Sequence, residues 1–221
     1  MKGFVVKWIH ALQPYRHFLA LLTLVPVLLW FQCLEAFIVP KYTVGIALDQ
    51  KIPFIPWFVI PYVVWFLFIA FGLCYTGLRS KENFYKLVIF LGGAMSIAYL
   101  LYTLFPNQQA LRPHITENGL LSAWVKWVYT VDTPTNVCPS VHVLNAFAVS
   151  AALLHTKEFA RSKARTLFVA VYFVLVCLST IFIKQHSVVD VICGLLIGLL
   201  FYIPLYRIKY PAPEWRKAFQ R

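Results

Sequence analysis

A histidine and an aspartate stand four residues apart inside a largely apolar stretch near the C-terminal end of the chain. The stretch runs from Ser179 to Asp190 and reads Ser-Thr-Ile-Phe-Ile-Lys-Gln-His-Ser-Val-Val-Asp. On a helix, His186 and Asp190 would share one face, so the carboxylate could accept a hydrogen bond from the imidazole. Ionisable residues are costly in sequence of membrane type and indicate either a function or a paired partner. The pair is therefore a candidate for chemistry.

Two further pieces offer groups that bind phosphate. The first is Cys-Pro-Ser-Val-His, which ends at His142. Proline is favoured at the first position of a helix, so we expect a helix to begin at Pro139, with Ser140, Val141 and His142 in its first turn. The free amides of that turn and the Ser140 hydroxyl could bind phosphate oxygens. The second piece is Arg112, whose guanidinium can contact two such oxygens at once.

The elements that position these residues are expected to be membrane helices. The chain has 221 residues, of which 61% are hydrophobic and 13% charged. It repeatedly runs about 20 residues without a charge, which is the length that crosses a bilayer core. We therefore expect an all-α polytopic membrane protein, a bundle of six transmembrane helices that forms a single domain over residues 1–221. The predicted spans are about 18–39, 57–78, 84–105, 138–155, 166–183 and 187–206.

The net charge of +12 is explained by membrane topology rather than by nucleic-acid binding. Basic residues accumulate in cytoplasmic loops. We therefore predict a protein of the cell membrane with both termini cytoplasmic and the motifs on the extracytoplasmic side. In this orientation the chain has fifteen basic residues on the cytoplasmic side and five outside. Those outside are Lys41, Lys51, Arg112, Lys126 and Lys184, and those inside are Lys2, Lys7, Arg16, Arg79, Lys81, Lys86, Lys157, Arg161, Lys163, Arg165, Arg207, Lys209, Arg216, Lys217 and Arg221. The expected partners are membrane lipids and a lipid substrate, with no nucleic acid.

The three pieces together resemble the motifs of the type 2 phosphatidic acid phosphatase (PAP2) superfamily. The family pattern has an Arg-Pro, a Pro-Ser-x-His and a Ser-Arg-x5-His-x3-Asp motif. In this chain they are Arg112-Pro113, Pro139-Ser140-Val141-His142, and Ser179 with His186 and Asp190. The resemblance implies a phosphatase for lipid phosphates that works through a phosphohistidine and needs no cofactor.

The resemblance also implies a role for each site residue. His186 would be the nucleophile, Asp190 would orient it, and His142 would protonate the leaving oxygen. Arg112 and Ser140, together with the amide of Val141, would hold the phosphoryl oxygens.

Two phosphate-binding cations of the family pattern are missing. The family's lysine, seven residues before Arg112, is Phe105 here, and the arginine after Ser179 is Thr180. We expect Lys184 to supply one of these charges beside His186. These changes are similar to the inositol phosphorylceramide and sphingomyelin synthase branch, so transfer of a phosphoryl head group to an alcohol is the alternative activity.

Other functions also fit some of these residues. The spacing of His186 and Asp190 suits two metal ligands. However, few carboxylates are expected on that side of the membrane, and a two-metal phosphatase uses more oxygen ligands, so we expect a metal-independent site. A transporter could use the same pair as a proton relay, and a lipid-binding protein could keep the motifs without activity. The sequence assigns no role to Glu35, His114 or Asp132.

Overall fold

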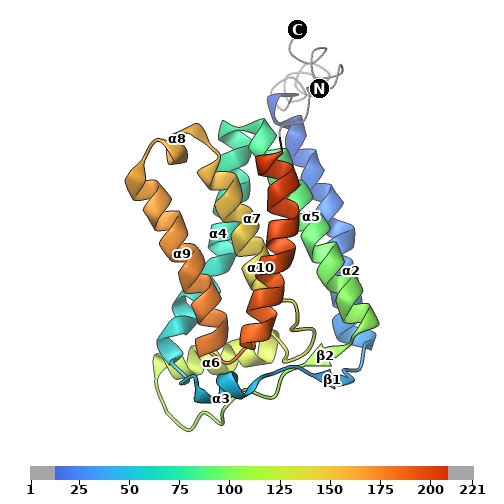
Figure 1. Ribbon diagram of the computed structural model, residues 1–221, viewed down its shortest axis with the longest axis vertical. Coiled ribbons are helices and arrows are strands. Elements are labelled where there is room, and N and C mark those ends of the chain that lie inside the picture. Colours follow the sequence, from blue (N-terminus) through green and yellow to red (C-terminus); the bar gives the residue numbers. More distant parts are fainter. Residues whose placement is uncertain (1–12, 209–221) are drawn as a thin grey trace, which may run out of the picture.

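The computed structural model of the protein describes residues 13–208 (Figure 1). Within that range most of the chain is helical and the two strands have two residues each, which confirms the all-α class. The prediction that both termini are cytoplasmic concerns residues 1–12 and 209–221, which lie outside the described range.

The long helices run along one common axis (Figure 1). A 3-10 helix, η1, leads into the first of them, and the π-helical segment η3 continues the last. The bounds are η1 (Gln13–Thr23), α2 (Leu24–Phe37), α4 (Val59–Arg79), α5 (Lys81–Leu104), α7 (Val141–Leu154), α9 (Lys163–Phe182), α10 (Val188–Tyr202) and η3 (Ile203–Arg207).

Several of these segments are long and apolar enough to cross a membrane, so the chain is a multi-pass membrane protein. Among the described residues the qualifying segments are Gln13–Phe37, Pro56–Arg79, Lys81–Leu104, Lys163–Phe182 and Val188–Arg207. The remaining predicted span, about residues 138–155, corresponds to α7. That helix has 14 residues, fewer than the about 20 that cross a bilayer core. The expected count of six spans is therefore not confirmed.

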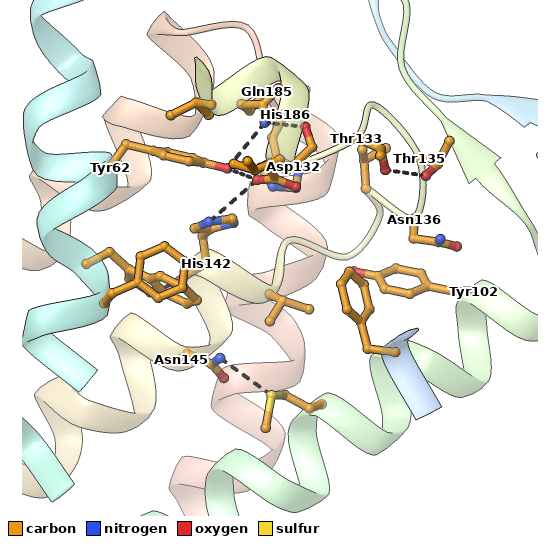
Figure 2. A pocket seen from close by; sticks show the side chains of 18 of the residues that line it. Tyr62, Tyr102, Asp132, Thr133, Thr135, Asn136, His142, Asn145, Gln185 and His186 are labelled. Atoms are coloured by element: carbon orange, nitrogen blue, oxygen red, sulfur yellow. Dashed lines mark hydrogen bonds and ion pairs between the residues drawn. The ribbon is translucent and has the colours of Figure 1, made fainter. Parts of the chain in front are cut away.

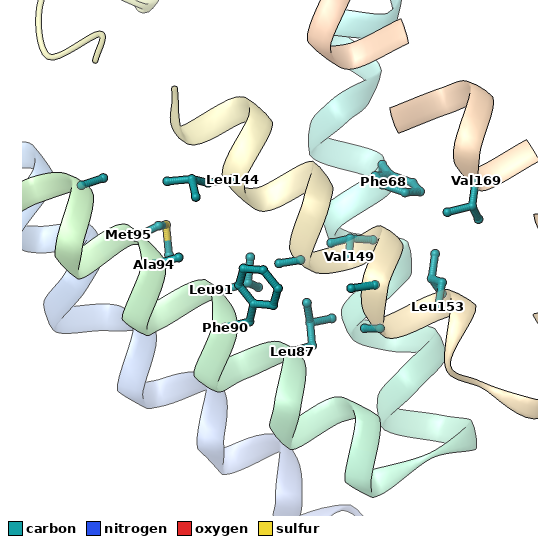
Figure 3. Packing of buried hydrophobic residues seen from close by; sticks show 14 of the residues in the cluster. Phe68, Leu87, Phe90, Leu91, Ala94, Met95, Leu144, Val149, Leu153 and Val169 are labelled. Carbon is teal, nitrogen blue, oxygen red and sulfur yellow. The ribbon is translucent and has the colours of Figure 1, made fainter. Parts of the chain in front are cut away.

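Helix α7 is short but lies at the centre of the bundle, in contact with α4, α5, α9 and α10. Its side chains Leu144, Val149 and Leu153 are fully buried, and they pack against α5 residues such as Leu87 and Phe90 (Figure 3). A helix that is apolar on all faces is stable only when it is surrounded. This packing fixes where α7 begins, and hence where its first turn lies.

Helix α10 approaches the start of α7 closely. A Cβ atom placed on Gly194 would lie 3.0 Å from the Ser140 carbonyl oxygen and 3.2 Å from Cβ of Val143. The Ser140 amide also donates to the Asp190 carbonyl, at 3.0 Å. The first turns of α7 and α10 are therefore held against each other.

Short elements gather at one end of the bundle, which we call the site end (Figure 1, bottom). The strands β1 and β2 pair in parallel there, with Tyr42 opposite Asn107. Helix α6 lies across this end, with Val125 and Val128 buried and Trp124 and Trp127 exposed. The elements are β1 (Tyr42–Thr43), α3 (Ala47–Lys51), η2 (Pro56–Phe58), β2 (Asn107–Gln108) and α6 (Leu120–Val131), whereas α8 (Lys157–Ala160) lies at the opposite, far end.

Candidate active site

His186 and Asp190 meet at the site end, but they do not share a helix as predicted. His186 lies in the turn between α9 and α10, and α10 begins only at Val188. Nδ1 of His186 is 3.2 Å from Oδ2 of Asp190. The same oxygen accepts the Ser187 amide at 2.9 Å, because Ser187 and Asp190 form a capping box at the start of α10. The pair therefore forms across a helix N-terminus rather than along a helix face.

The expected helix start at Pro139 is also wrong, because α7 begins at Val141. Ser140 is its N-cap, and the Ser140 hydroxyl accepts the Val143 amide at 3.5 Å. Pro139 lies before the cap, where its carbonyl accepts a hydrogen bond from the Tyr102 hydroxyl. The structure thus assigns the Ser140 side chain, which is fully buried, to capping.

The His142 imidazole is enclosed by aromatic rings. The ring of Tyr62 stacks on it with centroids 4.4 Å apart, and the ring of Trp65 lies at the same distance. The Trp65 indole donates to the His142 carbonyl at 3.0 Å. These contacts aim the imidazole toward His186, and the two imidazole centroids are 5.7 Å apart. Figure 2 shows His142 below His186, with Asp132 beside them.

Asp132 is a site residue to which the sequence assigned no role. Its Oδ2 atom lies 3.8 Å from Nε2 of His142 and accepts a hydrogen bond from the Tyr62 hydroxyl (Figure 2). Asp132 directly follows α6, and only the folded chain brings that helix end to α4 and α7. The one sequence indication is its position in the polar segment just before Cys138.

Arg112 binds backbone and side-chain oxygens around the site. Its Nε atom donates to Gln185 at 2.9 Å, one terminal nitrogen donates to the Tyr129 carbonyl at 2.9 Å, and the other donates to the Asp132 carbonyl. Burial lowers the pKa of Arg112, and the Asp132 carboxylate opposes that shift. The guanidinium therefore ties the end of α6 to the residue before His186.

Lys184 points away from the histidines. Its ammonium donates to the Asp49 carbonyl at 2.7 Å and the Ile52 carbonyl at 2.5 Å. Burial lowers the pKa of Lys184, and the nearby Asp49 opposes that shift. A phosphate contact of the kind expected would require the ammonium to leave these carbonyls.

Two sets of hydrogen bonds hold the segment between Asp132 and α7. The Glu35 carboxylate of α2 accepts hydrogen bonds from Thr133, Thr135 and Asn136. The Asn107 side-chain oxygen accepts the amides of Val137 and Cys138, each at 2.9 Å. Glu35 therefore pairs locally and positions the loop that carries Asp132.

A cavity of about 390 Å³ adjoins the two histidines and is enclosed by residues of α2, α4, α5, α6 and α7. Val141, His142 and His186 line it, whereas the side chains of Ser140 and Asp190 are completely buried. Its lining contains both polar and apolar side chains. The polar lining is Gln32, Tyr62, Tyr99, Tyr102, Asp132, Thr133, Thr135, Asn136, His142, Asn145, Gln185 and His186, and the apolar lining is Leu28, Phe31, Val63, Trp65, Phe66, Met95, Trp127, Val128, Val131, Val137 and Val141.

A metal-ligand set is not evident in the part of the chain that the structure describes. Residues 13–208 contain no cluster of three or more histidine, cysteine, aspartate or glutamate side chains that could hold a metal ion. One oxygen of Asp190 is already shared by His186 and Ser187.

One of three comparisons with known proteins identifies the family of the chain. The family model of the PAP2 superfamily matches residues 87–213, a range that contains Arg112, both histidines and Asp190. Neither the curated proteins nor the solved structures compared with the chain gave a match. Because the family match covers more than half of the 221 residues, the chain belongs to the PAP2 superfamily, whose members are membrane phosphatases and phosphotransferases that act on phosphate esters.

Proposed function

We propose that the protein is a lipid phosphate phosphatase that hydrolyses a phosphomonoester or diphosphate lipid through a phosphohistidine on His186. One observation carries the proposal. His186, paired with Asp190, faces His142 in a shared cavity, with 5.7 Å between the imidazole centroids. A nucleophile with its orienting carboxylate and an opposed acid–base group are the parts that phosphoryl transfer through an enzyme intermediate requires.

The first step forms a bond between His186 and phosphorus and breaks the ester bond to the lipid oxygen. Asp190 accepts a hydrogen bond from Nδ1–H of His186, so that the proton stays on Nδ1 and Nε2 carries the lone pair that attacks. His142, as the imidazolium, gives its proton to the leaving oxygen and releases the lipid as an alcohol. Asp132 stabilises that imidazolium from 3.8 Å.

The second step returns the enzyme to its starting state. Neutral His142 accepts a proton from water as the water oxygen attacks phosphorus, and the bond to His186 breaks. Inorganic phosphate leaves, and His142 is again protonated beside Asp132.

Groups around the cavity would stabilise the negative charge on the phosphoryl oxygens. We assign this role to Arg112 and the first-turn amides of α7, including that of Val141. Arg112 reaches the phosphate by exchanging its hydrogen bond to Gln185 for one to a phosphoryl oxygen. Ser140 holds the amides of this turn in place.

The apolar wall of the cavity supports a lipid substrate. It includes Leu28 of α2 and Phe66 of α4, whose exposed fractions are 54% and 62%. These side chains belong to helices that are apolar and long enough to cross a bilayer, so an acyl chain can lie along them while the phosphate contacts His142 and His186.

The distribution of basic residues supports an extracytoplasmic site in the cell membrane. Among the described residues, five lysines or arginines lie at the site end and nine at the far end. The more basic end of a membrane protein is the cytoplasmic one. Those at the site end are Lys41, Lys51, Arg112, Lys126 and Lys184, and those at the far end are Arg16, Arg79, Lys81, Lys86, Lys157, Arg161, Lys163, Arg165 and Arg207.

Head-group transfer is the second candidate, and the charge of the cavity favours it. Within residues 13–208, the cavity lining includes the Asp132 carboxylate but no lysine or arginine. A phosphomonoester carries close to two negative charges at neutral pH, whereas a phosphodiester carries one. Asp132 therefore repels a diester less. In the transferase, His186 would take the phosphoryl head group from the diester, the donor lipid would leave as an alcohol, and the acceptor alcohol would then take the head group from His186.

An assay that measures both inorganic phosphate and lipid products, run against a panel of lipid phosphates, tests both candidates. The purified protein is given phosphatidate, phosphatidylglycerol phosphate, a polyprenyl diphosphate and an inositol-containing phospholipid, each with and without an added alcohol. Phosphatase activity gives inorganic phosphate without alcohol, survives EDTA and is absent from His186→Ala. Product formed only with alcohol identifies the transferase. Loss of activity with EDTA and its rescue by zinc or magnesium would show metal dependence, and inactivity on the whole panel would favour a transporter or a lipid-binding protein.

A further inference from the structure

Asp49 is a buried carboxylate that the proposed reaction does not use. It lies in α3, is 2% exposed, and is separated by more than 130 residues from the chain segment that it contacts. Its Oδ2 atom accepts the Ser187 hydroxyl at 2.7 Å and the Ile46 amide at 2.7 Å. Its Oδ1 atom accepts the Val188 amide at 2.9 Å. Most of these contacts are therefore to the turn that carries His186.

The same turn contacts the α3 segment a second time, again as the donor. Lys184 donates through its ammonium to the carbonyls of Asp49 and Ile52, while its own carbonyl accepts from the Gln109 side chain at 3.0 Å. Its backbone is left-handed, with φ 57°, which is uncommon for a residue with a side chain. The two segments thus bind each other through a carboxylate on one and an ammonium on the other.

A short series of hydrogen bonds connects Asp49 to the imidazole of His186. Asp49 fixes the hydroxyl of Ser187, and the amide of Ser187 donates to Oδ2 of Asp190. That oxygen also accepts from Nδ1 of His186. Displacement of Ser187 would therefore move Asp190 relative to His186, and small errors in the position of a nucleophile cost large factors in rate.

We propose that Asp49 is a positioning residue for His186, that it acts through Ser187, and that Lys184 anchors the same contact instead of binding phosphate. The inference rests on the proposed function, in which His186 is the nucleophile. It assigns the segment around α3 to the active site, although no residue of that segment lines the cavity.

The alternative is that Asp49 only stabilises the fold by capping α10, since a carboxylate at a helix N-terminus is favourable in any case. A purely stabilising role predicts a lower melting temperature with unchanged turnover of the molecules that remain folded. A positioning role predicts a lower kcat at a nearly unchanged KM, because the cavity wall that binds the lipid is not altered.

The variants Asp49→Asn, Ser187→Ala and Lys184→Gln separate these roles, each measured on the full chain in detergent. Ser187→Thr keeps the hydroxyl and serves as the conservative rescue. Glu117→Gln removes an exposed carboxylate from the same end of the molecule and serves as the matched control. Two measurements are made on every variant: the phosphatase kcat and KM, and hydrogen–deuterium exchange of the peptide that contains residues 184–190.

We expect Asp49→Asn and Ser187→Ala each to lower kcat by about 10- to 100-fold, with KM changed by about twofold or less. The double variant should be no more than about threefold below the weaker single variant, because both changes act through the contact between Ser187 and Asp49. Exchange at Val188 should accelerate in both variants. Ser187→Thr and Glu117→Gln should resemble the parent protein.

Three results would overturn the inference. The first is an unchanged kcat and unchanged exchange in Asp49→Asn. The second is multiplication of the two single effects in the double variant. The third is a raised KM in Lys184→Gln that is equally large when Asp49 is also replaced by asparagine. That result would show that Lys184 binds phosphate. If the parent protein and His186→Ala release phosphate equally, the proposed function fails, and the exchange data then decide by themselves whether Asp49 orders the turn. If Asp49→Asn does not fold, the milder Ser187→Ala and Ser187→Thr pair gives the same comparison.

Discussion

The carboxylate of Asp132 faces the imidazole of His142, with 3.8 Å between Oδ2 and Nε2. His186 has a carboxylate of its own in Asp190, at 3.2 Å. The two carboxylates differ in access, because the side chain of Asp132 is 36% exposed and that of Asp190 is fully buried. We therefore expect Asp190 to act only through His186, and Asp132 to support the protonated state of His142 next to the substrate.

Replacing Asp132 with asparagine should reduce the supply of protons to the leaving group. We expect Asp132→Asn to lower kcat/KM for a lipid phosphate by about 10- to 100-fold, since the negative charge that stabilises the His142 imidazolium is lost. An aryl phosphate, whose phenolate leaves without a proton, should be affected little. An equal loss on both substrates would show that Asp132 does not act through His142.

The leaving group also separates the two histidines. If His142 is the general acid, His142→Ala should lower turnover of a lipid phosphate by about two to four decades and leave an aryl phosphate nearly unchanged. His186→Ala should abolish both reactions and the acid-labile phosphoenzyme. Asp190→Asn should lower both alike, because the imidazole is left in a poorer tautomer. A phosphoenzyme that persists in His186→Ala would place the covalent bond elsewhere.

The sequence predicted the residue pairs that depend on local spacing, and it failed where contacts cross the chain. It predicted the contact between His186 and Asp190 because they are four residues apart, but it assumed a helix where Ser187 caps one. It could not assign roles to Asp132 or Asp49, whose partners lie on other helices. It also placed the start of α7 two residues early, because a proline fits both the first helical position and the residue before a cap.

The close approach of α10 to α7 predicts a strict size limit at Gly194. In Gly194→Ala the new Cβ would lie 3.0 Å from the Ser140 carbonyl oxygen. This oxygen belongs to the backbone, so it cannot move away by a change of rotamer. We expect a loss of about 1–3 kcal/mol in stability, seen as a lower melting temperature in detergent, and a loss of activity because Ser140 and Asp190 move apart. Gly119→Ala is the control, since nothing lies within 4 Å of its Cβ. Equal melting temperatures for the two variants would contradict the packing.

Thiol labelling of Cys138 tests on which side of the membrane the site lies. Burial, followed by the nearby Asp190, raises the pKa of Cys138 above the usual range of a thiol. Less thiolate is then present at pH 8, so labelling should be slow at that pH and should accelerate as the pH rises. In a variant that keeps only Cys138, an impermeant thiol reagent should label intact cells. Labelling only after the cytoplasmic face is opened would reverse the proposed orientation.

The length of α7 has a consequence for the surrounding bilayer. Its 14 residues rise about 21 Å, whereas a typical hydrocarbon core is about 30 Å thick. If the C-terminal end of α7 lies at the opposite interface, its first turn, with His142, lies below the head-group layer unless the bilayer thins around it, and thinning costs a fraction of a kcal/mol per Å. A phosphate must descend by that depth before His186 can attack it. Turnover should accordingly be faster in vesicles of short-chain phosphatidylcholine than in vesicles of long-chain phosphatidylcholine, so the thickness of the host membrane would set the rate independently of the lipid consumed.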